Sequence, residues 1–114
     1  MIASEFRFHG RGSLNKAYRA GKTIGAGPIS LRYFGENRRK IRIAVVVSKK
    51  VSKSAVVRNV IRRRLYEIVR EKYLEGLKAG DYVFTVHNDQ VLKLQNIELE
   101  KLIRQTLERL NVLN

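Results

Sequence analysis

The 114-residue chain contains no cysteine or tryptophan, and only one proline and one methionine. Without cysteine it can form neither a disulfide nor a thiolate metal site, and this composition fits a reducing compartment. The longest apolar run, IAVVV at 43–47, is far too short to span a bilayer. The N-terminal sequence MIASEFRFHGRG lacks the apolar segment of a signal peptide, so we expect a cytoplasmic protein.

Acidic residues are scarce in the first half of the chain. Residues 1–66 hold 17 lysines and arginines against two acids, Glu5 and Glu36, which gives a net charge of +15, whereas residues 67–114 sum to −1. Such a basic segment repels itself unless it meets a polyanion, and phosphate binding releases condensed counterions. The charge distribution therefore favours nucleic acid over a membrane as the partner.

The length indicates a single RNA-binding domain over 1–114, with residues 1–12 as a basic N-terminal arm. Caps, turns and apolar periodicity predict the order αββαβα, with a further short strand near Thr23. The predicted elements are a helix at 13–20, strands at 29–34, 41–47 and 81–86, a helix at 55–74 and a last helix capped by Asn96. This order is typical of an α+β fold built as a two-layer α/β sandwich.

Two expectations concern the sheet. The loop at 35–40 is predicted to close a hairpin between the strands on either side of it. The strand at 41–47 is predicted to be central, because its residues are apolar on both faces.

The helix at 55–74, with Ser54 as N-cap, is predicted to have an apolar and a cationic face. Steps of 100° place one apolar stripe at Val57, Val60, Ile61, Leu65 and Ile68. The opposite arc holds Arg58, Asn59, Arg62, Arg63, Tyr66 and Arg70. Arg64 falls inside the apolar stripe, and the sequence leaves open whether it extends past the edge or reaches an anionic group.

Phosphate binding is predicted where this helix begins. Lys49, Lys50 and Lys53 precede a helix whose first amides have no partner of their own. Arginine forks bind phosphate bidentately, and no acid interrupts the segment from Ala55 to Tyr66. The alternative is a solvated loop and helix face, but exposed helix faces normally intersperse acids among their bases.

Other residues support weaker hypotheses. Aromatic side chains among the bases could stack on unpaired bases, although each is more often a core residue; they are Phe6, Phe8, Tyr18, Tyr33 and Phe34. Tyr66 is the exception, because it lies within the arginine arc. His9 and His87 could act as an acid and a base in a self-sufficient nuclease, but two separated histidines are more often surface residues. A ribosomal or RNA-chaperone protein remains the main alternative.

The stretch SKKVSKSAVVRNVIRRRLYEIV resembles the protein subunit of bacterial ribonuclease P, whose motif is an Ala-Val-x-Arg-Asn-x-x-Lys/Arg-Arg helix after a Ser-Lys-Lys strand end. The matching helix residues are Ala55, Val56, Arg58, Asn59, Arg62 and Arg63. The segment FRFHGRGSLNKAYRAGKTI resembles the family's basic arm and first helix, and GDYVFTVHND its last strand. The likeness thus covers nearly the whole chain.

The resemblance implies an αβββαβα sandwich with a left-handed crossover through the motif helix. It also implies an accessory subunit of the endoribonuclease that matures the 5′ end of precursor tRNA, with the catalysis and the Mg²⁺ belonging to an RNA subunit. This chain would then hold no catalytic residue, metal or small-molecule substrate. The residues implied to bind the catalytic RNA are Lys49, Lys50, Lys53, Arg58, Asn59, Arg62 and Arg63. Those expected to bind the single-stranded 5′ leader are Leu14, Tyr18, Ser30 and Arg32, joined by Tyr66.

Overall fold

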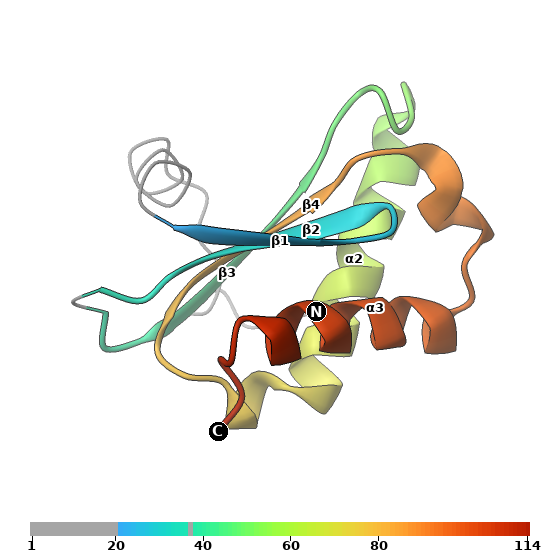
Figure 1. The fold of residues 1–114 in the computed structure, drawn as a ribbon. Helices are drawn as coiled ribbons and strands as arrows, with labels where there is room; N and C mark the ends of the chain where they lie inside the picture. The colour runs from blue at the N-terminus through green and yellow to red at the C-terminus, as the bar shows by residue number, and fades with distance from the viewer. Residues whose placement is uncertain (1–20, 37) are drawn as a thin grey trace.

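The computed structural model describes residues 21–36 and 38–114. Four strands form one sheet in the order β1-β2-β4-β3, and two helices pack against one face of it (Figure 1). The elements are β1 (Lys22–Ala26), β2 (Ile29–Phe34), β3 (Ile41–Val47), α2 (Ala55–Lys72), η2 (Leu74–Gly76), β4 (Gly80–Val86), η3 (Asp89–Lys93) and α3 (Asn96–Arg109). The predicted α+β sandwich is confirmed, while the helix predicted at 13–20 lies outside the described residues.

The short strand expected near Thr23 is β1, which pairs antiparallel with β2 from Lys22↔Tyr33 to Ala26↔Ile29. Gly27 and Pro28 form the turn between them. Gly27 has a φ of 58°, in the left-handed region that glycine enters without steric cost. This turn sets the register in which Thr23 lies opposite Arg32.

The predicted position of β3 is wrong, and so is the predicted hairpin. β3 lies at an edge of the sheet, and β4 is inserted between β2 and β3, antiparallel to the first and parallel to the second. The reason is that α2 carries the chain back to start β4 in the same direction as β3. β4 is buried along its length except at Thr85, as an interior strand requires. The left-handed sense of this crossover, which the family resemblance implies, stays a prediction.

The main core fills the space between the sheet and the two helices. Alternate residues of the strands point into it, among them Ile43, Leu31 and Phe84, which have no exposed surface. The second face of the sheet, turned away from α2 and α3, carries a small cluster of Phe34, Ala44 and Val83. β3 is thus apolar on both faces although it is an edge strand.

α3 buries one apolar stripe, but the cap predicted for it is wrong. Leu99, Ile103 and Leu107 are fully buried. The N-cap is Gln95, whose backbone N–H donates to Glu98 Oε1 at 3.1 Å. The Asn96 side chain instead accepts a hydrogen bond from Arg64.

Arg64 holds the start of α3 against α2. Its Nε donates to Asn96 Oδ1 at 3.0 Å, and its Nη groups donate to the carbonyls of Val91 (3.3 Å) and Leu94 (2.6 Å). The half-buried guanidinium therefore binds an amide oxygen and two backbone carbonyls. It binds carbonyl groups of η3 and of the residue just after it, and so ties α2 to the segment before α3, which accounts for an arginine inside an apolar stripe.

Candidate nucleic-acid interface

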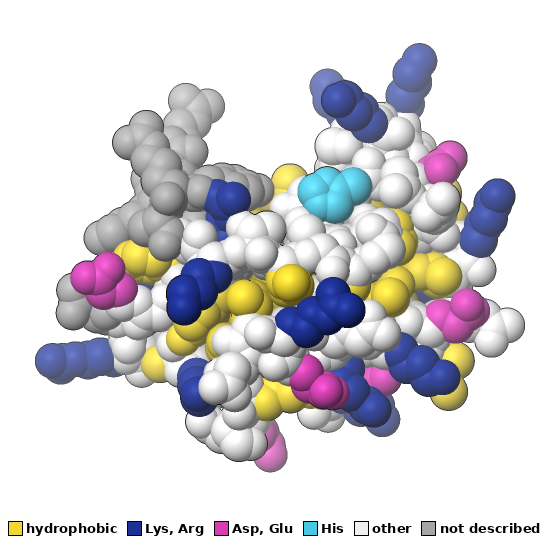
Figure 2. All heavy atoms as spheres, viewed as in Figure 1, with side chains coloured by type: hydrophobic (Ala, Val, Ile, Leu, Met, Phe, Trp, Pro, Cys, Tyr) yellow, Lys and Arg dark blue, Asp and Glu magenta, His cyan; other side chains and the backbone are white. Residues whose placement is uncertain are grey.

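The predicted phosphate-binding residues gather at one end of the molecule, around the loop between β3 and α2. We call this set the α2 basic surface: Lys49, Lys50, Lys53, Arg58, Asn59, Arg62 and Arg63. Figure 2 shows Lys and Arg side chains at the tip where this loop lies in Figure 1. All are exposed except Arg58 and Arg62, which are half-buried. The structure thus brings the predicted residues together.

The loop that carries the three lysines is tied down at several points. Val51 is buried, and its N–H donates to the Ser48 carbonyl at 3.0 Å. Ser54 caps α2 by accepting from the Val57 N–H at 3.3 Å, as predicted. Its own N–H donates to Ser52 Oγ at 3.1 Å. The lysines therefore extend from a loop with a defined path, so less conformational entropy is lost when they bind a partner.

The arginines of the α2 basic surface differ in their contacts. Arg58 Nη1 donates to the Ser52 carbonyl at 2.8 Å, so Arg58 supports the loop as well as adding charge. Arg62 Nη2 donates to Asn59 Oδ1, one turn earlier on the helix. Arg63 is exposed. The first turn of α2 contains no acid, so the positive end of the helix dipole and these cations act together on an anion.

Two details of the predicted α2 faces are wrong. Val60, predicted in the apolar stripe, is 48% exposed, because the buried face is centred further round on Ile61, Leu65 and Val69. Tyr66, predicted as an exposed ring for base stacking, is only 7% exposed and belongs to the main core. Tyr66 therefore offers no stacking surface for a leader.

The Tyr66 side chain instead protects the free edge of β3. Its hydroxyl accepts from the Val45 N–H at 3.2 Å and donates to the Ile43 carbonyl at 3.5 Å. An edge strand has backbone groups with no neighbouring strand, and such edges invite pairing with other chains. The tyrosine thus satisfies buried backbone groups that β4, on the other side of β3, cannot reach.

We expect Tyr66→Phe to destabilise the fold by about 1–2 kcal/mol, because the ring still fills its site while the two backbone groups lose a partner. Urea unfolding measures the change. The affinity for RNA should match that of the unmodified protein. An unchanged unfolding midpoint together with weaker leader binding would contradict this assignment.

Apart from Tyr66, the described leader-binding candidates are Ser30 and Arg32, which lie on the second face of the sheet. Ser30 Oγ lies 2.7 Å from His87 Nε2, and Arg32 Nε donates to Thr23 Oγ1 at 2.5 Å. Ser30 and Arg32 are both half-buried. The other two candidates, Leu14 and Tyr18, lie outside the described residues.

A charge cluster on the same face was not predicted from the sequence. Asp81 is completely buried and accepts hydrogen bonds from Arg42 and Arg38. The hydrogen bond to Asp81 raises the pKa of Arg42 above its ordinary value. One signal was available: the basic run at 38–42 and an aspartate at the start of a buried strand indicate a paired carboxylate.

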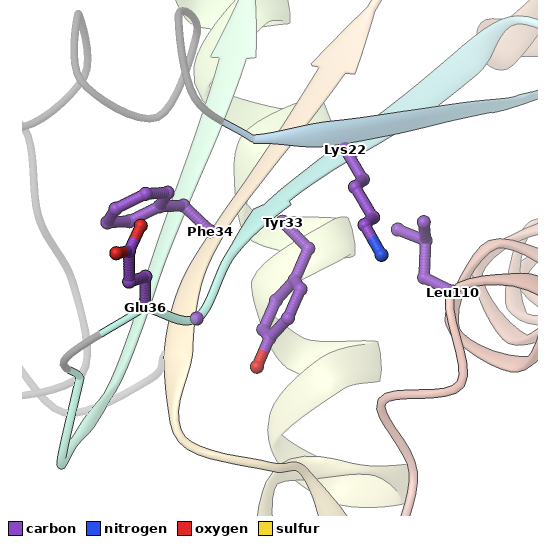
Figure 3. Close-up of a pocket in the computed structure, with 6 residues that line it drawn as sticks. Lys22, Tyr33, Phe34, Glu36 and Leu110 are labelled. Carbon is purple, nitrogen blue, oxygen red and sulfur yellow. The ribbon is translucent and has the colours of Figure 1, made fainter.

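A pocket of about 380 Å³ opens where β2 ends, beside the first residue of β1. Its lining includes Lys22, Tyr33, Phe34 and Leu110, and Figure 3 shows Tyr33 and Phe34 pointing to opposite sides of the sheet. The Tyr33 hydroxyl donates to the Ala79 carbonyl at 2.7 Å. Burial raises the pKa of Tyr33, with a smaller effect from the charge of Asp81. This hydroxyl is therefore a neutral structural donor.

Within 21–36 and 38–114, no three side chains of the metal-ligating types are grouped so that they could hold an ion. Neither helix in this part of the chain is both long and apolar enough to cross a membrane.

Sequence comparison gives matches over the whole chain. The family model described as Ribonuclease P matches residues 2–111. The ribonuclease P protein component of Roseiflexus sp. (strain RS-1) is 35% identical over 95 residues, which cover 83% of this chain and 77% of that protein. The corresponding protein of Pseudanabaena sp. (strain PCC 6903) is 33% identical, with 100% and 98% covered.

Solved structures share the fold at lower identity. The RNase P protein of Staphylococcus aureus has a TM-score of 0.83 and 18% identity, with 96% of this chain and 98% of that chain covered. The RNase P protein from Thermotoga maritima has a TM-score of 0.79 and 19% identity, with 90% and 96% covered.

The fold and its surface define a basic α+β sandwich protein with a cationic patch at the start of its longer helix. The family match and the identities above 30% are more specific than the fold. The chain belongs to the ribonuclease P protein family.

Proposed function

We propose that this chain is the accessory protein subunit of ribonuclease P, which binds a catalytic RNA and supports cleavage at the 5′ end of precursor tRNA. The observation that carries the proposal is the α2 basic surface, where seven side chains with no acid among them gather on a capped helix and a tied loop. Membership of the family supports the same role.

The α2 basic surface and the second face of the sheet are proposed to bind different RNAs. In this proposal the α2 basic surface binds the folded catalytic RNA, because clustered arginines fit closely spaced phosphates. The second face of the sheet, through Ser30 and Arg32, binds the single-stranded leader, together with Leu14 and Tyr18 from the segment before β1. Tyr66 is left out of this set because its ring is buried.

The chemistry belongs to the RNA subunit in this proposal, and Mg²⁺ is held by that RNA. The chain contributes positive charge that screens repulsion between the phosphates of the catalytic RNA and those of its substrate. We therefore expect the protein to lower the Mg²⁺ concentration at which cleavage occurs. A cytoplasmic location, alongside the precursor RNAs, is part of the same proposal.

Sequencing the RNAs that copurify with the chain tests the choice of partner. One strongly enriched structured RNA, the ribonuclease P RNA, is the expected result. Ribosomal RNA or a diffuse pool would favour a ribosomal or RNA-chaperone protein instead. A matched control is a variant with Arg62 and Arg63 changed to alanine, which should lose the enriched RNA while keeping its fold.

A further inference from the structure

The charge cluster on the second face has a geometry that suggests a second RNA contact. Asp81 accepts from Arg42 Nε and Nη2, both at 2.8 Å, and from Arg38 Nε at 3.0 Å. The Arg38 guanidinium carbon lies 5.0 Å from the centroid of the Phe34 ring. One carboxylate thus meets two guanidinium groups, so the cluster keeps a positive charge although its acid is fully buried.

Arg42 and Arg38 form different contacts with the Asp81 carboxylate. Arg42 makes a two-point contact to Asp81, which is the stronger arrangement and neutralises the buried charge. Arg38 donates only its Nε, and across the described parts of the chain its Nη groups form no hydrogen bond. Its side chain is 23% exposed. Arg38 therefore retains a charge that Asp81 does not cancel and two terminal amino groups that can bind a ligand.

Phe34 and Asp81 restrict the orientation of the Arg38 fork. The carboxylate fixes one edge of the guanidinium, and the Phe34 ring supports one of its faces. Such a fork matches two oxygens of a phosphate group, and a side chain already ordered before binding loses less entropy. Exposed Lys40 adds positive charge nearby. Glu36, which lines the same pocket as Phe34, is the opposing acid (Figure 3).

We propose that Arg38 binds a phosphate group of single-stranded RNA on the second face, and that Asp81 and Phe34 are the residues that position it. This inference rests on the proposed function, because it continues the leader path from Ser30 and Arg32. Ser30 and Phe34 are four residues apart on β2, or ~13 Å along the strand. A leader that passes Ser30 and Arg32 and follows β2 toward the β2–β3 loop therefore reaches Arg38.

The simpler alternative is that the Asp81 cluster only stabilises the β2–β3 loop and binds no RNA. The two readings are separated by Arg38→Ala and a matched control, Arg39→Ala, which removes the same charge from the neighbouring exposed position. Each variant is assembled with ribonuclease P RNA. The affinity for precursor tRNA is then measured with a long leader and with a one-nucleotide leader, over a range of salt concentrations.

We expect Arg38→Ala to weaken binding of the long-leader precursor by about tenfold, which corresponds to about 1.4 kcal/mol. The slope of log affinity against log salt should decrease by about 0.7, the value for one phosphate contact on a single strand. Affinity for the one-nucleotide leader and for the catalytic RNA should not change. Arg39→Ala should behave like the unmodified protein, and Arg38→Lys should recover only part of the loss.

Asp81→Asn tests the positioning role, because it leaves Arg38 in place but removes the charge that holds it. A loss specific to long leaders is expected. Should this variant unfold in a thermal melt, Phe34→Leu removes only the ring beneath Arg38 and should give the same pattern. Equal losses for Arg38→Ala and Arg39→Ala, or unchanged long-leader binding in Arg38→Ala, would overturn the inference. If the unmodified protein gives equal affinity for the long-leader and the one-nucleotide-leader precursor, the proposed role in leader binding is itself contradicted.

Discussion

Replacing Ile61 with aspartate should abolish the folded state. Ile61 has no exposed surface and lies in the main core between α2 and the sheet. The change removes a large apolar side chain, at about 2–5 kcal/mol, and buries a carboxylate with no partner, at several kcal/mol more. A domain of this size has a total stability of about 5–15 kcal/mol, so the loss is comparable with the whole. Far-UV circular dichroism and urea unfolding measure it.

The matched control is Val60→Asp, one residue earlier on the same helix. Val60 is 48% exposed, so its carboxylate stays in water and the fold should survive with a change within about 1 kcal/mol. Val57 is half-buried, and Val57→Asp should fall between the two. A cooperative unfolding transition for Ile61→Asp at the midpoint of the unmodified protein would show that α2 does not pack as described.

The second large effect is expected on RNA affinity. Arg62→Ala and Arg63→Ala should each weaken binding of ribonuclease P RNA by about tenfold, because charge-assisted hydrogen bonds contribute about 1.5–3 kcal/mol each. The double variant should lose about a hundredfold if the two contacts are independent. Filter binding or fluorescence titration against salt concentration measures both the affinity and its salt slope.

The control for this prediction is Lys101→Ala, which removes one charge from an exposed position on α3. It should leave both affinity and slope unchanged. Arg58→Ala is a less specific test, because Arg58 also holds the Ser52 carbonyl and its loss would loosen the loop that carries the lysines. Equal losses for Lys101→Ala and Arg62→Ala would indicate a diffuse charge effect and not a defined surface.

Much of the fold could be predicted because its local signals are strong. Ser54 caps α2 as predicted, since a serine before an apolar-periodic segment satisfies a free amide. The alternation in β2 and the stripe of α3 follow from burial on one face. The α2 basic surface was predictable for the same reason, because residues close in sequence on one loop and one helix must lie close in space.

The errors arise where distant segments decide the outcome. The edge position of β3 depends on β4, which pairs with it only after α2 has returned the chain. The burial of Tyr66 depends in turn on that edge, since its hydroxyl binds the free backbone groups of β3. Helical periodicity placed Tyr66 among the arginines but contained no information about the strand beside it.

The Asp81 cluster shows a similar dependence on pairing across the sheet. Arg42 lies opposite Asp81 because β3 and β4 are parallel neighbours in that register. Arg38 comes from the preceding loop, and Phe34, beneath it, ends β2. Four residues from β2, the β2–β3 loop, β3 and β4 meet only once the strand order is known, so the sequence alone did not assign them a common role.

The most direct test of the central claim is cleavage of precursor tRNA at low Mg²⁺ by a bacterial ribonuclease P RNA, with and without this protein, beside the protein alone. We expect correct 5′ cleavage only when both the RNA and the protein are present. Cleavage by the protein alone, or no gain when the protein is added to the RNA, would contradict that claim.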